Sequence, residues 1–259
     1  MKLEVVSIPD GEARLAGLRY MPETSAQPVA LLYAHGFTAG KYSLDGLASY
    51  LAGRGYEGLT FDFVGHKLGC SGGEMRHLSQ ATDNLAAALA WLRRVTEAGR
   101  IVLIGHSMGA GAALQVAAQA VARDVRSAAA LRSDLNGVAK VAGVVSMCVG
   151  KKPTEGFGQK IGATMLAQRE DYVAGAPPAE LLREMDRMVL AAGELGGLPA
   201  LFIAARQDVI VPVAGVESLA ALAGSNAEFA VVEAAHLDAP DRSRATIIRW
   251  LEDLTLSSS

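Results

Sequence analysis

The arrangement of hydrophobic residues constrains the fold of this chain more than any other feature. From residue 29 onward, short apolar runs alternate with longer segments of helical periodicity. The runs are VALLYA (29–34), YEGLTFDF (56–63), RIVLIG (100–105), VAGVVSMCV (141–149), PALFIAA (199–205) and AEFAVVEAA (227–235). Strands that are apolar on both faces are buried on both faces, as happens when helices flank a parallel sheet. The pattern therefore predicts an α/β fold.

Two segments differ from this alternation. Residues 2–8 and 13–21 surround the turn PDGE and predict an antiparallel hairpin at the start of the sheet. Residues 150–197 contain no convincing strand, although 177–192 have apolar residues at helical spacing and a proline in the first turn. We predict one domain over residues 1–259, with a lid or cap inserted at about 150–197. An elaborated crossover between two strands is the alternative for this insertion.

Charge and cysteine content exclude several classes of partner. The chain of 259 residues has a formal net charge of −3 and an isoelectric point near 6.0, which does not favour binding to nucleic acid. Cys70 and Cys148 are far apart in sequence and match no metal-ligand spacing, so free thiols are expected. The sequence has no signal-peptide core and no apolar run of the ~18 residues that a membrane span needs. We expect a cytoplasmic protein.

One serine stands where a catalytic nucleophile is expected. The sequence Gly105-His106-Ser107-Met108-Gly109 fits G-x-S-x-G, directly after a predicted strand and directly before a predicted helix. Such a turn strains the serine backbone and lifts its hydroxyl to the carboxyl edge of the sheet, while the flanking glycines allow strand and helix to approach closely. A chance match in a sequence rich in alanine and glycine is the alternative. The setting favours Ser107 as a nucleophile.

A serine nucleophile needs a base, and the base needs an acid that orients it. Of the five histidines, His236 alone follows the last apolar run and precedes the final helix, in the chain order serine, acid, histidine. Asp208 follows the run at 199–205, where it could instead cap the next helix. We predict that Ser107, Asp208 and His236 form a catalytic triad.

Two backbone amides are candidates for stabilising the oxyanion of a tetrahedral intermediate. The N–H of Met108 lies at the start of the helix that follows the serine. The N–H of Phe37 belongs to the loop YAHGFTAG, in which Gly36 would let the chain bend towards the site. A plain glycine turn is the alternative for that loop.

These separated pieces, HGF, GHSMG, ARQDVIVP and AAHLD, together resemble the α/β-hydrolase family over essentially the whole chain. The resemblance implies an eight-stranded, mostly parallel sheet with an initial antiparallel hairpin and a lid after the sixth strand. It also implies the roles already assigned to the triad and to the two amides. The loop FDFVGHKLGCSGG resembles the family's D-x-x-G-H-G-x-S turn, but Gly69 stands at the serine position and Ser71 comes two residues later. HGFTAG and FDFVGH are similar to small bacterial carboxylesterases of the cinnamoyl/feruloyl esterase type.

The combined prediction is a serine hydrolase that cleaves carboxylic esters of small substrates through an acyl-enzyme, without a metal or organic cofactor. Thioesterases, amidases or peptidases, and perhydrolases use the same triad and stay open as alternatives. A ligand-binding protein that has lost catalysis is a further alternative. The expected partner is a small-molecule ester, with neither nucleic acid nor a membrane span, and a homo-oligomer is possible.

Overall fold

The computed structural model describes all residues except 24–25, 130–138, 154, 156–157, 159 and 257–259. The predicted strands are all present and form one eight-stranded sheet in the order β1-β2-β4-β3-β5-β6-β7-β8. The strands are β1 (Lys2–Asp10), β2 (Ala13–Met21), β3 (Val29–Ala34), β4 (Gly58–Phe61), β5 (Arg100–His106), β6 (Lys140–Met147), β7 (Ala200–Ala205) and β8 (Ala227–Val232). Only the pairs β1/β2 and β2/β4 are antiparallel, and the other pairs are parallel. The predicted fold class is therefore confirmed.

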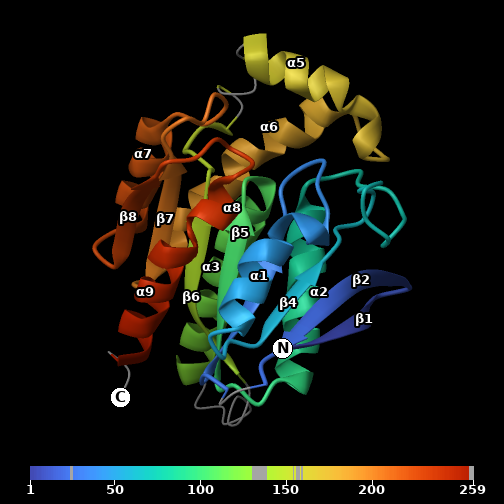
Figure 1. Cartoon of the computed structure of the whole chain (residues 1–259). Helices are drawn as coiled ribbons and strands as arrows, with labels where there is room; N and C mark the ends of the chain where they lie inside the picture. The colour runs from blue at the N-terminus through green and yellow to red at the C-terminus, as the bar shows by residue number, and fades with distance from the viewer. Residues whose placement is uncertain (24–25, 130–138, 154, 156–157, 159, 257–259) are drawn as a thin grey trace.

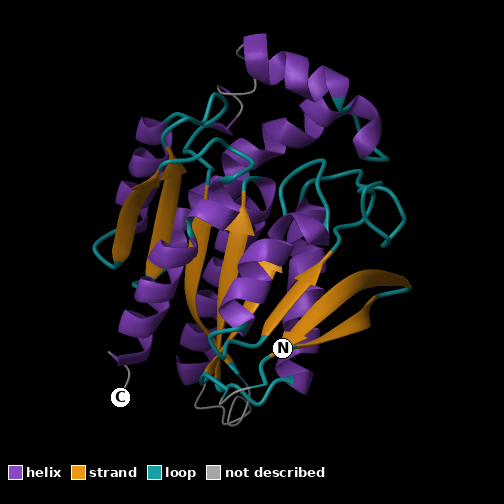
Figure 2. Cartoon of the chain, in the orientation of Figure 1, coloured by secondary structure: helices purple, strands orange, loops and turns teal. Residues whose placement is uncertain are grey.

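Helices cover both faces of the sheet (Figures 1 and 2). One face carries η1 (Lys41–Leu44), α1 (Asp45–Ala52), α8 (Ala239–Arg242) and α9 (Arg244–Leu256). The other carries α2 (Ser79–Val95), α3 (Met108–Ala129), α6 (Pro178–Met188), η3 (Val189–Glu194) and α7 (Val213–Ala223). This two-sided cover explains why every residue of β3 and of β7 is buried, as their apolar runs predict.

Several elements differ in extent from the sequence prediction, among them β4, β8 (227–232 rather than 227–235) and the final helix. The predicted strand at 56–63 is shorter in the structure, where β4 ends at Phe61. Asp62 still donates its backbone N–H to the Ala16 carbonyl of β2, while its carboxylate accepts bonds from neighbouring loops. The predicted final helix is divided into α8 and α9 at Ser243. The buried Ser243 hydroxyl donates a hydrogen bond of 2.6 Å to the carbonyl of Ala239, which competes with the helical pattern at that point.

The insertion after β6 has two physically different parts. Helix α6 buries Leu181, Leu182 and Met185 against the body of the domain, chiefly beside α3. Helix α5 (Lys160–Gln168) lies above the carboxyl edge of the sheet and leaves Ile161 exposed, followed by η2 (Glu170–Tyr172) (Figure 1). Part of the predicted lid, at 154, 156–157 and 159, lies outside the described residues.

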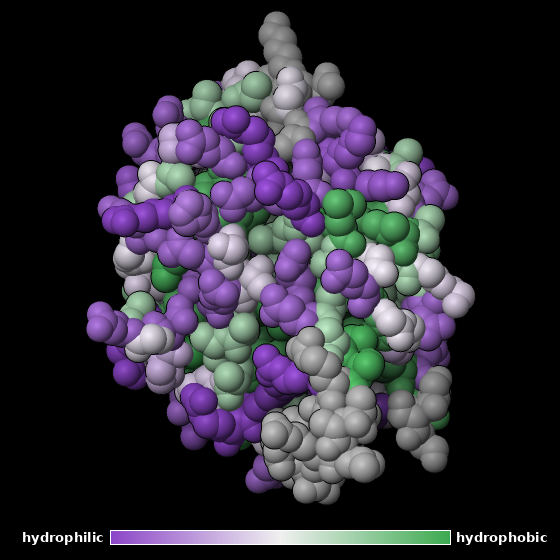
Figure 3. All heavy atoms as spheres, turned by 180° about the vertical axis from the view of Figure 1, so that it is seen from behind, coloured by the Kyte–Doolittle hydropathy of each residue, from purple (hydrophilic) through white to green (hydrophobic). Residues whose placement is uncertain are grey.

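The surface of the molecule is mixed in polarity. Seen from behind, hydrophilic residues cover most of the surface, with smaller hydrophobic areas between them (Figure 3). None of the described helices is long and apolar enough to cross a membrane. Both cysteines are free, as expected, with Cys148 buried and Cys70 exposed.

The different packing of α5 and α6 can be tested by stability. Leu181→Ala should lower the free energy of unfolding by about 2–5 kcal/mol, because it leaves a cavity at a fully buried position. Ile161→Ala, at a side chain that is 53% exposed, should cost less than about 0.5 kcal/mol. Urea unfolding followed by circular dichroism measures both values. Equal losses would contradict the assignment of α6 alone to the core.

Candidate active site

Ser107 occupies a strained turn between β5 and α3. Its φ of 53° lies in the left-handed region, which residues other than glycine rarely adopt. A Cβ on Gly109 would overlap the carbonyl oxygen of Ala34, and one on Gly105 would overlap the backbone of Ala110. The turn can therefore form only with glycine at both positions, which explains the G-x-S-x-G spacing physically.

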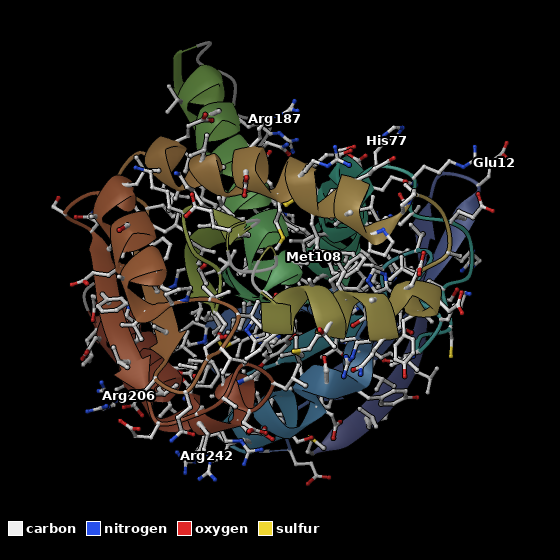
Figure 4. The ribbon with its side chains drawn as sticks, turned by 90° about the horizontal axis from the view of Figure 1, so that it is seen from above. Glu12, His77, Met108, Arg187, Arg206 and Arg242 are labelled. Carbon is white, nitrogen blue, oxygen red and sulfur yellow. The ribbon has the colours of Figure 1, made fainter. Side chains whose placement is uncertain are left out.

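Hydrogen bonds fix this turn from two sides. The Ser107 N–H donates to the Met147 carbonyl at the end of β6, at 2.8 Å. The Ser107 carbonyl accepts from the Ala110 N–H in the first turn of α3, at 2.9 Å. Seen from above, the labelled Met108 lies near the centre of the molecule, between α5 and α6 (Figure 4). The strain at Ser107 is thus maintained by the sheet and by the helix together.

His236 and Asp208 lie side by side, although 28 residues separate them in sequence. His236 Nδ1 is 2.7 Å from Asp208 Oδ2, and the other carboxylate oxygen accepts bonds of 2.8 Å from the N–H groups of Ile210 and Val211. Burial opposes ionisation of Asp208, but the hydrogen bond and charge of His236 and the two amides outweigh it, so the Asp208 pKa is lowered. A carboxylate ionised in this place holds the Nδ1 proton on His236 and leaves Nε2 as the basic nitrogen.

The serine and the histidine line one cavity of about 370 Å³ at the carboxyl edge of the sheet. Phe37, which the sequence places near the site, lines it as well. The remaining lining residues are mostly apolar and come from several loops and from α5, among them Leu68, Met165, Leu166, Ile210, Leu237 and Pro240. The cavity can therefore hold a small, mainly apolar molecule next to Ser107.

The two candidate oxyanion amides lie in different backbone settings, one at the start of a helix and one in a loop. The Met108 N–H is the first of α3, and such amides have no partner within their own helix. The Phe37 N–H follows Gly36, where a Cβ would lie 3.4 Å from the Cβ of Ser107. Within the part of the chain that the structure describes, neither amide donates a hydrogen bond to a protein acceptor. Phe37 itself lines the cavity, whereas Met108 is fully buried and directly follows Ser107, so both amides stay candidates for the oxyanion site.

His106 connects the serine turn to the loop of His236, a contact that its sequence position did not reveal. His106 Nε2 lies 2.9 Å from the His236 carbonyl oxygen, and the two ring centroids are 4.9 Å apart. Burial lowers the pKa of His106 to about 3, so its ring is neutral and donates this hydrogen bond.

Cys148 lies in the same neighbourhood, and its sulfur and ring nitrogens of His106 and His236 all lie within 4.8 Å of one another. Burial and the charge of Asp208 raise the pKa of the Cys148 thiol, which opposes the thiolate form that metals bind. His106 and His236 already use ring nitrogens in the contacts described above. A protonated thiol is a poor metal ligand, and His106 and Asp208 hold His236 through the contacts described above.

His35 and Asp62 hold the loops on the other side of the cavity. His35 Nδ1 lies 2.8 Å from the Gly36 carbonyl, and its Nε2 accepts a bond of 3.1 Å from the Phe63 N–H. Asp62 accepts bonds from the backbone N–H and the ammonium of Lys41, at 2.7 and 2.6 Å. It accepts a third bond, of 2.8 Å, from the Cys70 N–H. These contacts fix the backbone on both sides of Phe37.

The departure from the family's D-x-x-G-H-G-x-S turn has a structural explanation. A Cβ on Gly69 would overlap the carboxylate of Asp62, so a serine cannot occupy this position in the observed loop. Ser71 instead donates a bond of 2.6 Å to the Asp62 carbonyl and accepts one of 2.9 Å from the Ala16 N–H. The displaced serine thus still ties the loop to β2.

The buried ion pair between Lys41 and Asp62 should matter for stability. Burial disfavours charged Lys41, but the hydrogen bond and charge of Asp62 outweigh this cost and raise the Lys41 pKa above its ordinary value. Lys41→Met leaves a fully buried carboxylate without its counter-ion and should cost about 3 kcal/mol in urea unfolding. Lys152→Met, which removes an exposed pair with Glu155, is the matched control and should change stability little. A similar loss in both variants would contradict the role of Lys41.

The buried histidines predict a loss of stability in acid. Burial holds the His35 pKa well below 6.5 and lowers those of His66 and His106 to about 4 and about 3. Below about pH 6.5 the unfolded chain takes up protons that the folded chain cannot bind, so stability falls as pH falls. Each group should contribute a slope of about 1.4 kcal/mol per pH unit down to its folded pKa.

Urea unfolding between about pH 7 and about pH 4.5 measures this slope, because the window starts above the histidine pKa of the unfolded chain and ends above those of the folded chain. His66→Gln should reduce the slope, whereas His77→Gln, at a side chain that is 73% exposed, should leave it unchanged. A free energy of unfolding that is constant over this range would show that the buried rings can be protonated without unfolding.

Comparisons with known proteins agree with this architecture. A family model described as the alpha/beta hydrolase fold matches residues 29–190, more than half of the chain. No curated protein sequence matches significantly. Among solved structures, the Pyrococcus furiosus esterase Pf2001 is 19% identical with a TM-score of 0.72, over 98% of this chain and 91% of that one.

Two further structures show the same similarity. The esterase domain of a Rhodothermus marinus protein is 20% identical with a TM-score of 0.68, over 98% of this chain and 99% of that one. Est1E from Butyrivibrio proteoclasticus, in a structure with ferulic acid bound, is 16% identical with a TM-score of 0.70, over 95% of this chain and 99% of that one. At such identities these structures support the fold alone, and this fold is the one that the family model describes. The chain belongs to the α/β-hydrolase fold family.

Proposed function

We propose that the protein is a serine esterase that hydrolyses carboxylic esters of small substrates through an acyl-enzyme. The observation that carries this proposal is the 2.7 Å contact between His236 Nδ1 and Asp208 Oδ2, in a cavity that His236 shares with the strained Ser107. A neutral imidazole held in this way can accept a proton at Nε2. The esterases among the solved structures of similar fold support the same reaction class.

The first half of the reaction forms the acyl-enzyme. Ser107 Oγ attacks the ester carbonyl carbon while His236 Nε2 takes the hydroxyl proton. The N–H groups of Phe37 and Met108 donate hydrogen bonds to the resulting oxyanion. The tetrahedral intermediate then collapses, the bond between the carbonyl carbon and the alcohol oxygen breaks, and His236 gives its proton to the leaving alcohol.

The second half repeats these steps with water. His236 removes a proton from water as the water oxygen attacks the acyl carbon, and the same two amides hold the second oxyanion. Collapse releases the carboxylic acid and returns the proton to Ser107. Asp208 stays ionised throughout and stabilises the imidazolium that forms in each half. The reaction requires no metal or organic cofactor.

We assign the part of the insertion around α5 as the lid of this cavity. Met165 and Leu166 of α5 line it, and apolar residues in that place would exclude water from the reacting ester. Helix α6 packs as part of the domain body and connects the lid to it.

Covalent labelling tests the nucleophile. A fluorophosphonate probe should add once to the native protein and not to Ser107→Ala, as measured by intact mass. Ser43→Ala is the matched control, because Ser43 lines the same cavity but donates its hydroxyl to the Gly40 carbonyl. Labelling that persists in Ser107→Ala, or its absence from the native protein, would contradict the proposal.

Kinetics of Asp208→Asn test the triad separately. An amide in this place no longer favours the required His236 tautomer, so kcat for a 4-nitrophenyl ester should fall by about 10³–10⁴-fold. Parallel assays of an ester, a thioester and an amide of the same acyl group distinguish an esterase from enzymes that share the triad. A kcat within about tenfold of the native value would show that Asp208 does not orient the base.

A further inference from the structure

Arg169 places a positive charge at the cavity next to Ser107, and ester hydrolysis itself does not need this charge. It is the only lysine or arginine among the described residues that line this cavity, and no aspartate or glutamate lines it. The pair Lys151-Lys152, shortly after β6 in the chain, lines a separate cavity of about 520 Å³. The cation of Arg169 therefore faces a space of otherwise mostly apolar walls.

The side chain of Arg169 is held in position at its charged end. Its Nη1 donates a hydrogen bond of 3.2 Å to Thr38 Oγ1. Thr38 directly follows Phe37, is 5% exposed and has a φ of 63°, so it is part of the constrained loop on the oxyanion side. The guanidinium carbon also lies 5.6 Å from the ring centroid of Tyr172, within range of a cation–π contact.

The backbone next to Arg169 is anchored to the body of the protein. The Lys67 N–H donates 2.9 Å to the Tyr172 carbonyl, and the Ala174 N–H donates 2.8 Å to the Gly65 carbonyl. A further bond of 2.8 Å runs from the Met75 N–H to the Ala174 carbonyl. The segment that follows Arg169 is thus attached to the loop after β4, and the cation has a defined place over the cavity.

No carboxylate neutralises this cation within the part of the chain that the structure describes, since Arg169 takes part in none of its ion pairs. The bond to Thr38 occupies Nη1, while Nε and Nη2 make no hydrogen bond to a described residue. This edge of a guanidinium is the one that binds a carboxylate through two parallel hydrogen bonds.

We propose that Arg169 determines substrate specificity by binding a carboxylate carried by the ester, so that the preferred substrates are anionic esters. The proposal deepens the esterase function and rests on it for the identity of the reacting group. The carboxylate can belong to the acyl part, as in a monoester of a dicarboxylic acid, or to the alcohol part. In both cases the apolar residues hold the carbon skeleton while Arg169 holds the charge.

Matched substrates test the proposal and distinguish the two positions of the charge. For the acyl part, 4-nitrophenyl hydrogen glutarate is compared with 4-nitrophenyl methyl glutarate. For the alcohol part, the butyrate ester of 4-hydroxybenzoate is compared with that of methyl 4-hydroxybenzoate. The native enzyme should have the higher kcat/KM for the anionic member of at least one pair.

Arg169→Met should lower kcat/KM for the preferred anionic ester by about 10- to 100-fold, mainly through KM, and change the neutral ester less than about twofold. Arg169→Lys should restore part of the preference, because it keeps the charge without the planar fork. Arg183→Met is the control, since Arg183 is exposed on α6 and does not line the cavity. Equal losses on both members of a pair, or an unchanged preference, would overturn the proposal.

A binding measurement separates this proposal from the esterase function. Calorimetry on Ser107→Ala should detect monomethyl glutarate but not dimethyl glutarate at the same concentration, and the further change Arg169→Met should abolish binding. Such binding without hydrolysis by the native protein would retain the anion site and reject the esterase. Hydrolysis by the native protein, together with binding that Arg169→Met leaves unchanged, would retain the esterase and reject the anion site. Thermal unfolding of each variant excludes misfolding as the cause.

Discussion

The close approach of three backbone segments around Ser107 is the constraint on which the rest of the site depends. Strand β5, the start of α3 and the loop after β3 meet at distances that leave no room for a Cβ on Gly105 or Gly109. This crowding keeps Ser107 in a left-handed conformation and places its side chain at the carboxyl edge of the sheet. The same approach places Gly36, and with it Phe37, beside Ser107, where a Cβ on Gly36 would lie 3.4 Å from the Cβ of Ser107.

The loops around this turn are held by buried polar side chains rather than by the sheet. His35 bonds the loop after β3 to the loop after β4, and His106 bonds the serine turn to the loop of His236. Asp62 accepts hydrogen bonds from Lys41 and from the backbone N–H of Cys70, so that these groups form one network. Such groups stabilise one arrangement strongly, because any other arrangement would leave a buried donor, acceptor or charge unpaired.

The backbone segments and buried polar side chains that position the site also contribute to the stability of the fold. Burial lowers the pKa values of His35, His66 and His106, so the stability of the protein depends on pH through groups outside the candidate triad. In the insertion, α6 packs into the core through apolar side chains, and the segment that follows Arg169 is attached by backbone hydrogen bonds. The proposed specificity residue Arg169 thus belongs to a different segment of the chain from Ser107, Asp208 and His236.

Residue patterning along the chain is sufficient to predict the sheet, the flanking helices and the positions of the triad candidates. Continuous apolar runs can be satisfied only by burial on both faces, and G-x-S-x-G, Asp208 and His236 each follow such a run, so parallel strands bring them to one edge. The shorter β4, the role of Ser71 and the buried pair of Lys41 with Asp62 follow from the packing of the folded chain and could not be predicted from these patterns. The same holds for the position of Arg169 at the cavity. These contacts join loops far apart in sequence, where no local periodicity or turn chemistry specifies the partner, and only the packed arrangement of the strands and insertion brings them together.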